Sequence, residues 1–134
     1  MPGGDAQAMT QSPQQWLEQA DYDLATAEVL LREERYFYAV FMCHLALEKA
    51  LKGLYRARAA SPPPRTHNLV FLLNGAGVQA DGVTAKFLVL QSEAQIAARY
   101  PEDLDTLRER FPRHVVEDIV AKTTEALRWI RRQF

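Results

Sequence analysis

The segment from Tyr36 to Arg58 places the strongest constraint on how this chain folds. Its apolar residues form two rows at helical spacing: Tyr36, Val40, Cys43, Leu47, Ala50 and Leu54 in one, and Phe37, Phe41, Leu45 and Leu51 in the other. A helix that is apolar around most of its circumference needs neighbours on more than one side. The segment ends in basic residues, which suits the negative end of a helix dipole. We therefore predict a long central helix.

Start and stop signals predict the helices that would cover it. Ser12, Pro13 and Gln15 have the pattern of a capping box that opens a first amphipathic helix. The prolines of segment 61–64 end the central helix. Beyond them we predict a short helix capped by Thr66 and running through Leu73, a helix from about Gly82 to Ala98 capped by Asp81, and a last helix that begins near Pro112 after a polar stretch through Phe111.

The later helices each show an apolar row. The apolar row of the third long helix is Phe87, Leu90, Ala94 and Ala97, flanked by Leu88 and Ile96, and the core stripe of the last helix is Val116, Ile119, Val120, Thr123, Leu127 and Ile130. No segment alternates apolar and polar residues as a strand does. We therefore predict an all-α fold, an up-and-down four-helix bundle with an extra short helix.

The length and composition indicate one domain. The 134 residues suffice for a single core, and we predict a flexible tail over residues 1–11 followed by one domain over 12–134. The single cysteine, Cys43, allows no disulfide within the chain and sits in an apolar run, so we expect it to be buried. With no signal peptide pattern and no apolar run of about 18 residues, we expect a cytoplasmic protein without a membrane span.

The charge is nearly balanced but unevenly placed. Sixteen basic and seventeen acidic residues give a net charge of −1, which argues against a surface coated all over in nucleic acid. Segment 49–80 contains no acidic residue, so one face could attract phosphate groups, or the surface could simply be dipolar. The three histidines are scattered without other ligands at metal-binding spacing, and no glycine-rich phosphate loop precedes a helix. We predict no metal and no cofactor.

Two polar groupings could bind phosphate. His44, Glu48 and Lys52 lie one helical turn apart on the central helix, with Lys49 beside them. This pattern is either a routine ion pair with a core histidine or a polar stripe shared with a ligand or subunit. The sequences Arg65-Thr66-His67 and Arg99-Tyr100-Pro101 stand at helix ends, where they could converge around a phosphate or serve as caps and packing residues.

A third grouping pairs Arg108 with His114 across five residues near the start of the last helix. If copies of this helix faced each other in a dimer, neutral histidine could draw a proton from a ribose 2′-hydroxyl. Arginine would stabilise the charge that develops on the phosphate, so RNA could be cleaved without a metal. A chain rich in arginine also produces this spacing by chance.

Four motifs in register resemble the HEPN family (higher eukaryotes and prokaryotes nucleotide-binding domain). They are Trp16 with Ala20-Asp21-Tyr22-Asp23-Leu24; Tyr36-Phe37-Tyr38-Ala39-Val40-Phe41 leading into Cys43-His44-Leu45-Ala46-Leu47-Glu48-Lys49-Ala50-Leu51-Lys52; Thr66-His67-Asn68-Leu69; and Arg99-Tyr100-Pro101. The resemblance implies a helical bundle, usually a homodimer, and a prokaryotic partnership with a small nucleotidyltransferase, often as a toxin–antitoxin pair.

The resemblance also divides the possible functions. Some members resemble metal-independent ribonucleases marked by Arg-x4-6-His, and Arg108 to His114 falls within that spacing. Members with Arg-Tyr-Pro-Asp look more like nucleotide-binding or partner modules, and here Glu102 is interposed before the Asp. We therefore expect a dimeric module that binds a nucleotide or a protein partner, or alternatively a ribonuclease toxin. The expected nucleotide or phosphate contacts are His44, Lys49, Lys52, His67, Arg99 and Tyr100, and whether the chain is an enzyme is left open.

Overall fold

The computed structural model describes residues 11–99 and 104–134, and for residues 93–99 it describes the backbone alone. Six helices and no strand occur in this part of the chain. They are α2 (Pro13–Arg32), α3 (Tyr36–Ala59), α4 (Leu69–Gly75), α5 (Gly82–Arg99), α6 (Leu104–Arg110) and α7 (Arg113–Arg132). The predicted all-α class is confirmed. None of these helices, within the ranges given, is long and apolar enough to cross a membrane.

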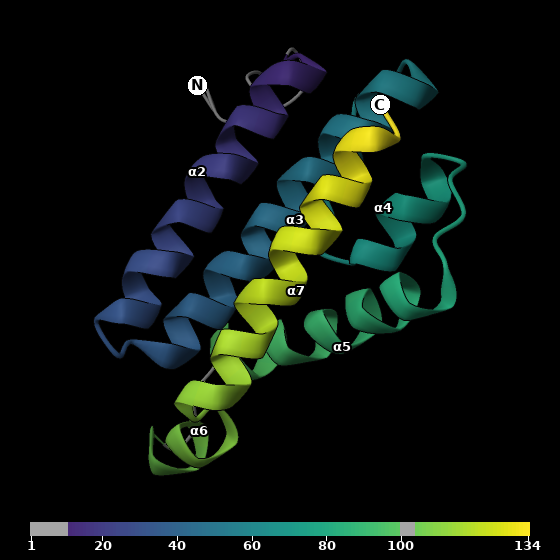
Figure 1. Ribbon diagram of the computed structural model, residues 1–134. Coiled ribbons are helices and arrows are strands. Elements are labelled where there is room, and N and C mark those ends of the chain that lie inside the picture. Colours follow the sequence, from purple (N-terminus) through teal and green to yellow (C-terminus); the bar gives the residue numbers. More distant parts are fainter. Residues whose placement is uncertain (1–10, 100–103) are drawn as a thin grey trace.

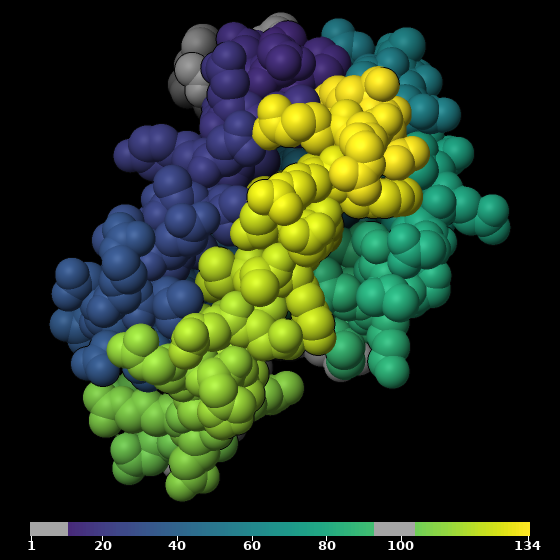
Figure 2. Space-filling model, in the orientation of Figure 1, coloured from purple at the N-terminus to yellow at the C-terminus, as the bar shows by residue number. Residues whose placement is uncertain are grey.

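Helix α3 is the centre of the fold, as its two apolar rows predict. It contacts α2, α4, α5, α6 and α7. In Figure 1, α2 and α7 run alongside α3, whereas α5 crosses it obliquely. Figure 2 shows the face on which α7 lies between α2 on one side and α4 with α5 on the other. Eleven residues of α3 are buried, from Ala39 to Leu54, because neighbouring helices cover more than one of its sides.

The core consists of two clusters along α3. The larger surrounds its second half and includes Leu47, Leu51 and Leu54 with side chains from α2, α4, α5 and α7. The smaller surrounds its first half and joins α2, α6 and α7. Cys43 belongs to this smaller cluster and is fully buried, as predicted. Burial raises the pKa of the Cys43 thiol to about 12, so the thiol stays protonated at neutral pH.

The predicted helix starts are mostly confirmed. The Ser12 hydroxyl oxygen accepts a hydrogen bond from Gln15 N (3.1 Å), and the Gln15 amide oxygen accepts one from Ser12 N (2.8 Å), which completes the capping box. Asp81 caps α5, since its Oδ1 accepts from Thr84 N at 2.7 Å. The predicted cap of the short helix is wrong. Asn68 caps α4 through Phe71 N (3.0 Å), and Thr66 instead accepts from Asn68 N (3.1 Å).

Two further predictions need correction in the second half of the chain. Leu90 belongs to the predicted apolar row of α5 but is 53% exposed, whereas Leu88, predicted to flank that row, and Gln91 are buried. The amide Nε2 of Gln91 donates to the Val40 carbonyl oxygen at 3.0 Å, which explains why a polar side chain can face α3. The side chains of Ala94 and Ala97 lie outside the described residues. No helix is predicted in the polar stretch through Phe111, but Leu104–Arg110 forms α6, whose Leu107 packs in the core.

Candidate binding sites

A buried carboxylate, that of Glu48, organises the first candidate site. Glu48 is 5% exposed in the middle of α3. Lys52, one turn later, places Nζ 3.0 Å from Glu48 Oε2. His67, from the loop before α4, places Nδ1 2.7 Å from Oε1. His44, one turn earlier, has Nε2 3.5 Å from the same oxygen. We call these four residues the Glu48 cluster.

The Glu48 cluster keeps its carboxylate ionised. Burial alone would raise the pKa of Glu48, but the His44 and His67 rings and the Lys52 ammonium together lower it to about 2. With Glu48 ionised, His67 Nδ1 must be the donor of the 2.7 Å hydrogen bond, an assignment that follows from the partner's charge. The second ring nitrogen of His67, whose side chain is 54% exposed, is then the one available to a ligand.

The predicted phosphate-binding residues therefore do not form one basic cluster. Lys49 faces α2, where its Nζ lies 2.8 Å from Asp23 Oδ2. His44 is fully buried and has no surface from which to contact a ligand in this conformation. Arg99 ends α5, but its side chain lies outside the described residues, and so does Tyr100 entirely. The structure thus brings His44, Lys52 and His67 together around the Glu48 carboxylate, whereas Lys49 pairs with Asp23 of α2.

Arg108 lies on the short helix α6, and His114 lies on the long helix α7 that follows it. Arg108 is in α6 with a side chain 67% exposed, and Asp105 Oδ1 lies 3.9 Å from its Nη1. His114 lies in the first turn of α7, as predicted, and its side chain is exposed. The buried Phe111 marks the corner between the two helices. Both side chains are thus accessible, in contrast to His44.

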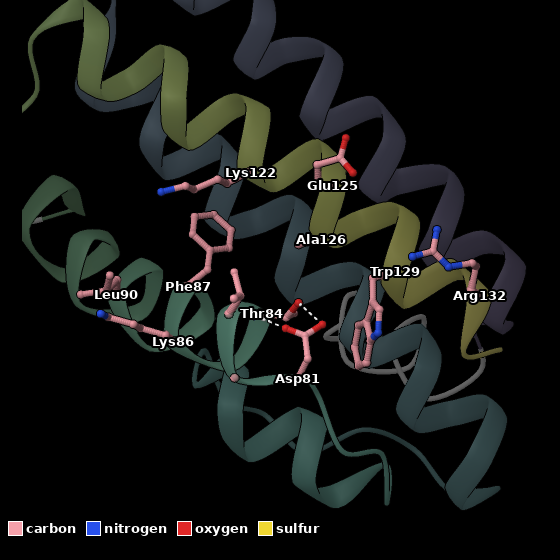
Figure 3. Close-up of a pocket in the computed structure, with 12 residues that line it drawn as sticks. Asp81, Thr84, Lys86, Phe87, Leu90, Lys122, Glu125, Ala126, Trp129 and Arg132 are labelled. Carbon is pink, nitrogen blue, oxygen red and sulfur yellow. Dashed lines mark hydrogen bonds between the residues drawn. The ribbon is translucent and has the colours of Figure 1, made fainter.

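Sequence reasoning misses a groove between α5 and α7, shown in Figure 3. Its volume is about 770 Å³. Apolar side chains line both walls: Val83, Phe87 and Leu90 from α5, and Ala126 and Trp129 from α7. Charged residues at its edges are Asp81, Lys86, Lys122, Glu125 and Arg132. The signal in the sequence is the row containing Phe87 and Leu90, which periodicity alone assigns to the core.

No group of three or more potential metal ligands occurs in residues 11–99 and 104–134 as described. The candidate sites that we compare in these residues are the Glu48 cluster, the pair Arg108 and His114, and the α5–α7 groove. In the Glu48 cluster, the Lys52 ammonium already neutralises the carboxylate. Arg108 and His114 are both exposed and stand six positions apart in the sequence. The α5–α7 groove is mostly apolar, with charged residues at its edges.

Comparison with known proteins agrees with the fold. The HEPN domain family matches residues 13–133. Two solved structures are similar: TT1696 from Thermus thermophilus (TM-score 0.76, 23% identity, 91% of this chain and 98% of that one) and ST0689, an archaeal HEPN homologue (TM-score 0.75, 20% identity, 92% and 98%). Comparison with curated proteins gave no match. The family match spans nearly the whole sequence, and the chain belongs to the HEPN family.

Proposed function

We propose that this HEPN chain is a non-catalytic binding module that forms a homodimer and acts with a small nucleotidyltransferase as a toxin–antitoxin-like pair. The observation that carries the proposal is the open α5–α7 groove, which presents apolar side chains and cations to solvent. Such an exposed apolar surface with a charged edge is typical of a binding site. The basic residues of the Glu48 cluster, by contrast, already neutralise a carboxylate of the chain itself.

The nucleotide-binding half of the proposal depends on two side chains. His67 offers its second ring nitrogen, and the Lys52 side chain, which binds the same carboxylate, is 14% exposed. A phosphate oxygen at this edge would accept from the Lys52 ammonium and, when the His67 ring carries a proton on both nitrogens, from the second His67 N–H. Arg99 and Tyr100 remain proposed contacts from the end of α5. Lys49, paired with Asp23, would contribute only after giving up that ion pair.

Calorimetric titration with ATP and GTP tests the proposed nucleotide binding. We expect saturable binding in the micromolar to millimolar range, weakened about tenfold in His67→Ala through the loss of one charge-assisted hydrogen bond of about 1.4 kcal/mol. His114→Ala is the control, because His114 lies outside the cluster, and it should bind as the wild type does. No saturable binding of either nucleotide would remove this half of the proposal.

Light scattering tests the assembly. We expect the purified chain to have twice the mass of its 15.2 kDa monomer. If a small nucleotidyltransferase is encoded beside this chain, as the proposal expects, co-expression of the two should give a stable complex of larger mass. A monomer, or a neighbouring nucleotidyltransferase that elutes separately at micromolar concentration, would contradict the proposal.

A ribonuclease remains the second candidate, favoured by the exposure of Arg108 and His114 on adjoining helices. Neutral His114 would accept the proton of a ribose 2′-hydroxyl, and Arg108 would stabilise the phosphate charge in the transition state. Under this alternative, His114→Ala loses about 10²-fold or more in RNA cleavage, while His67→Ala retains it. Intact RNA after incubation with the wild-type protein would exclude this alternative.

A further inference from the structure

The α5 wall of the groove carries a helical row that is covered only at its centre, where the half-buried Phe87 packs against the core. Val83, Phe87 and Leu90 follow the i, i+4, i+7 spacing, and all three line the groove. Val83 is 81% exposed and Leu90 is 53% exposed, although Leu88 on the same helix is fully buried. Helix α5 therefore has two apolar faces, and only one of them packs against α3. Exposed apolar side chains on both sides of the half-buried Phe87, all lining one groove, indicate an interaction surface, unlike single exposed apolar residues.

The α7 wall matches this row. Ala126 and Trp129 line the groove at i, i+3 spacing. In Figure 3, Phe87 and the Trp129 ring both point into the space between the two helices. The segment from Val83 to Leu90 rises about 10 Å at ~1.5 Å per residue. That length equals two turns of an added helix, whose apolar face would repeat at i, i+3 or i+4, and i+7.

The charges at the groove leave a positive excess. Asp81 is occupied as the cap of α5, with hydrogen bonds from Thr84 N (2.7 Å) and Thr84 Oγ1 (3.2 Å). Glu125 accepts from Arg128 at 2.9 Å in a pair that is largely exposed and weak, so the lining as a whole sets three cations (Lys86, Lys122 and Arg132) against two acids. Lys86 and Arg132, by contrast, have no acidic partner among the side chains that the structure describes.

A second lysine joins them. Lys122 pairs with Asp118 at 2.9 Å, but both side chains are more than half exposed, so this pair is weak and easily exchanged. Figure 3 shows Lys86 and Lys122 extending to the same side from opposite walls. A ligand that fits this groove therefore needs an apolar centre and acidic flanks.

We infer that the α5–α7 groove docks an acidic amphipathic helix of a protein partner. Apolar side chains of that helix pack against Phe87, Leu90 and Trp129, and its Asp or Glu flanks pair with Lys86 and Lys122. The inference depends on the proposed function as a binding module and specifies the chemistry of its partner. A nucleotide fits less well, because apolar side chains form both walls of the groove, whereas a triphosphate needs polar donors around it.

Fluorescence anisotropy with designed helical peptides tests the inference. The probe is a labelled peptide of about five helical turns with leucines at i, i+4 and i+7 and glutamates on the flanks, and its counterpart carries lysines in place of the glutamates. We expect the wild type to bind the glutamate peptide saturably and at least about tenfold more tightly than the lysine peptide. Leu90→Asp should weaken binding at least about tenfold, and the double variant Lys86→Glu with Lys122→Glu should reverse the preference between the peptides.

Matched controls come from α2. Val29 (46% exposed) and Arg32 lie outside the groove, so Val29→Asp and Arg32→Glu should bind the glutamate peptide as the wild type does. Because Leu90 is largely exposed and the two lysines lie at the groove's edges, thermal unfolding of their variants should match the wild type. That measurement separates loss of binding from loss of folding.

Four outcomes would overturn the inference. Equal binding of both peptides, or none, removes the acidic helix as occupant. Displacement of the peptide by ATP assigns the groove to a nucleotide. Conversion of a dimer to a monomer by Leu90→Asp assigns it to a second copy of the chain. A nucleotidyltransferase complex that is unaffected by Leu90→Asp would overturn this inference while leaving the proposed function intact.

Discussion

Replacing Glu48 with Gln is expected to lower the free energy of unfolding by about 3 kcal/mol at pH 7. The folded state holds the pKa of Glu48 at about 2 instead of 4.5, and each pKa unit corresponds to about 1.4 kcal/mol. The neutral amide loses this stabilisation and leaves the Lys52 ammonium without its buried counterion. Urea denaturation of the two proteins at the same pH measures the difference.

The difference in unfolding free energy between the wild type and Glu48→Gln should shrink as the pH falls. Because folding lowers the pKa of Glu48, its contribution is complete above about pH 4.5 and disappears as the pH falls toward 2. The wild type should therefore lose about 3 kcal/mol more than Glu48→Gln across this window. The matched control is Glu125→Gln, since Glu125 is 72% exposed in its pair with Arg128 and should change stability by less than about 0.5 kcal/mol. If the difference in unfolding free energy between the wild type and Glu48→Gln stayed constant from pH 7 down to about pH 2, this account of Glu48 would be wrong.

The second large effect is expected at Gly53, where α2, α3 and the C-terminus meet. A Cβ there would lie 2.8 Å from Trp16 Cβ, 3.1 Å from the Pro13 carbonyl oxygen and 3.2 Å from Phe134 Cζ. Alanine in place of glycine favours a helix by about 1 kcal/mol, but overpacking costs about 1–3 kcal/mol. Because two of the three contacts involve a backbone oxygen and a Cβ, which cannot rotate away, we expect Gly53→Ala to lower stability by about 1–2 kcal/mol.

Gly82 supplies the comparison for Gly53. It also lies in a helix, but nothing lies within 4 Å of its ideal Cβ. Gly82→Ala should therefore leave the unfolding free energy unchanged or raise it by up to about 1 kcal/mol. Thermal unfolding of both variants is the measurement. If Gly53→Ala were as stable as Gly82→Ala, the close packing of α2 on α3 would not limit residue size at this position.

The central helix is predictable from sequence because its apolar rows cover most of its circumference. Helix α5 is more difficult because it also has two apolar faces, of which only one packs in the core. Periodicity alone favours the row with Phe87 and Leu90, since the competing face includes Gln91. That glutamine is buried because it reaches the Val40 carbonyl, a contact between residues 51 positions apart that no local pattern contains.

The Glu48 cluster, too, is only partly predictable from the sequence. The one-turn spacing of His44, Glu48 and Lys52 is visible in the sequence, where it indicates either an ion pair or a ligand-binding stripe. His67 joins them through a loop 19 residues from Glu48, so only the tertiary structure shows that a carboxylate is the centre of the group. Lys49 differs from Lys52 in direction because positions three apart on a helix are offset around its axis, and its partner Asp23 comes from α2.

The single buried thiol makes the native fold resistant to thiol reagents. Since Cys43 is fully enclosed and its pKa is about 12, maleimides and disulfide reagents can modify it only in molecules that have opened. The rate of labelling in native buffer therefore reports how often the first half of α3 separates from α7 and α2. Because the sequence holds one cysteine, the chain carries its own probe of these opening motions, and no engineered label is required.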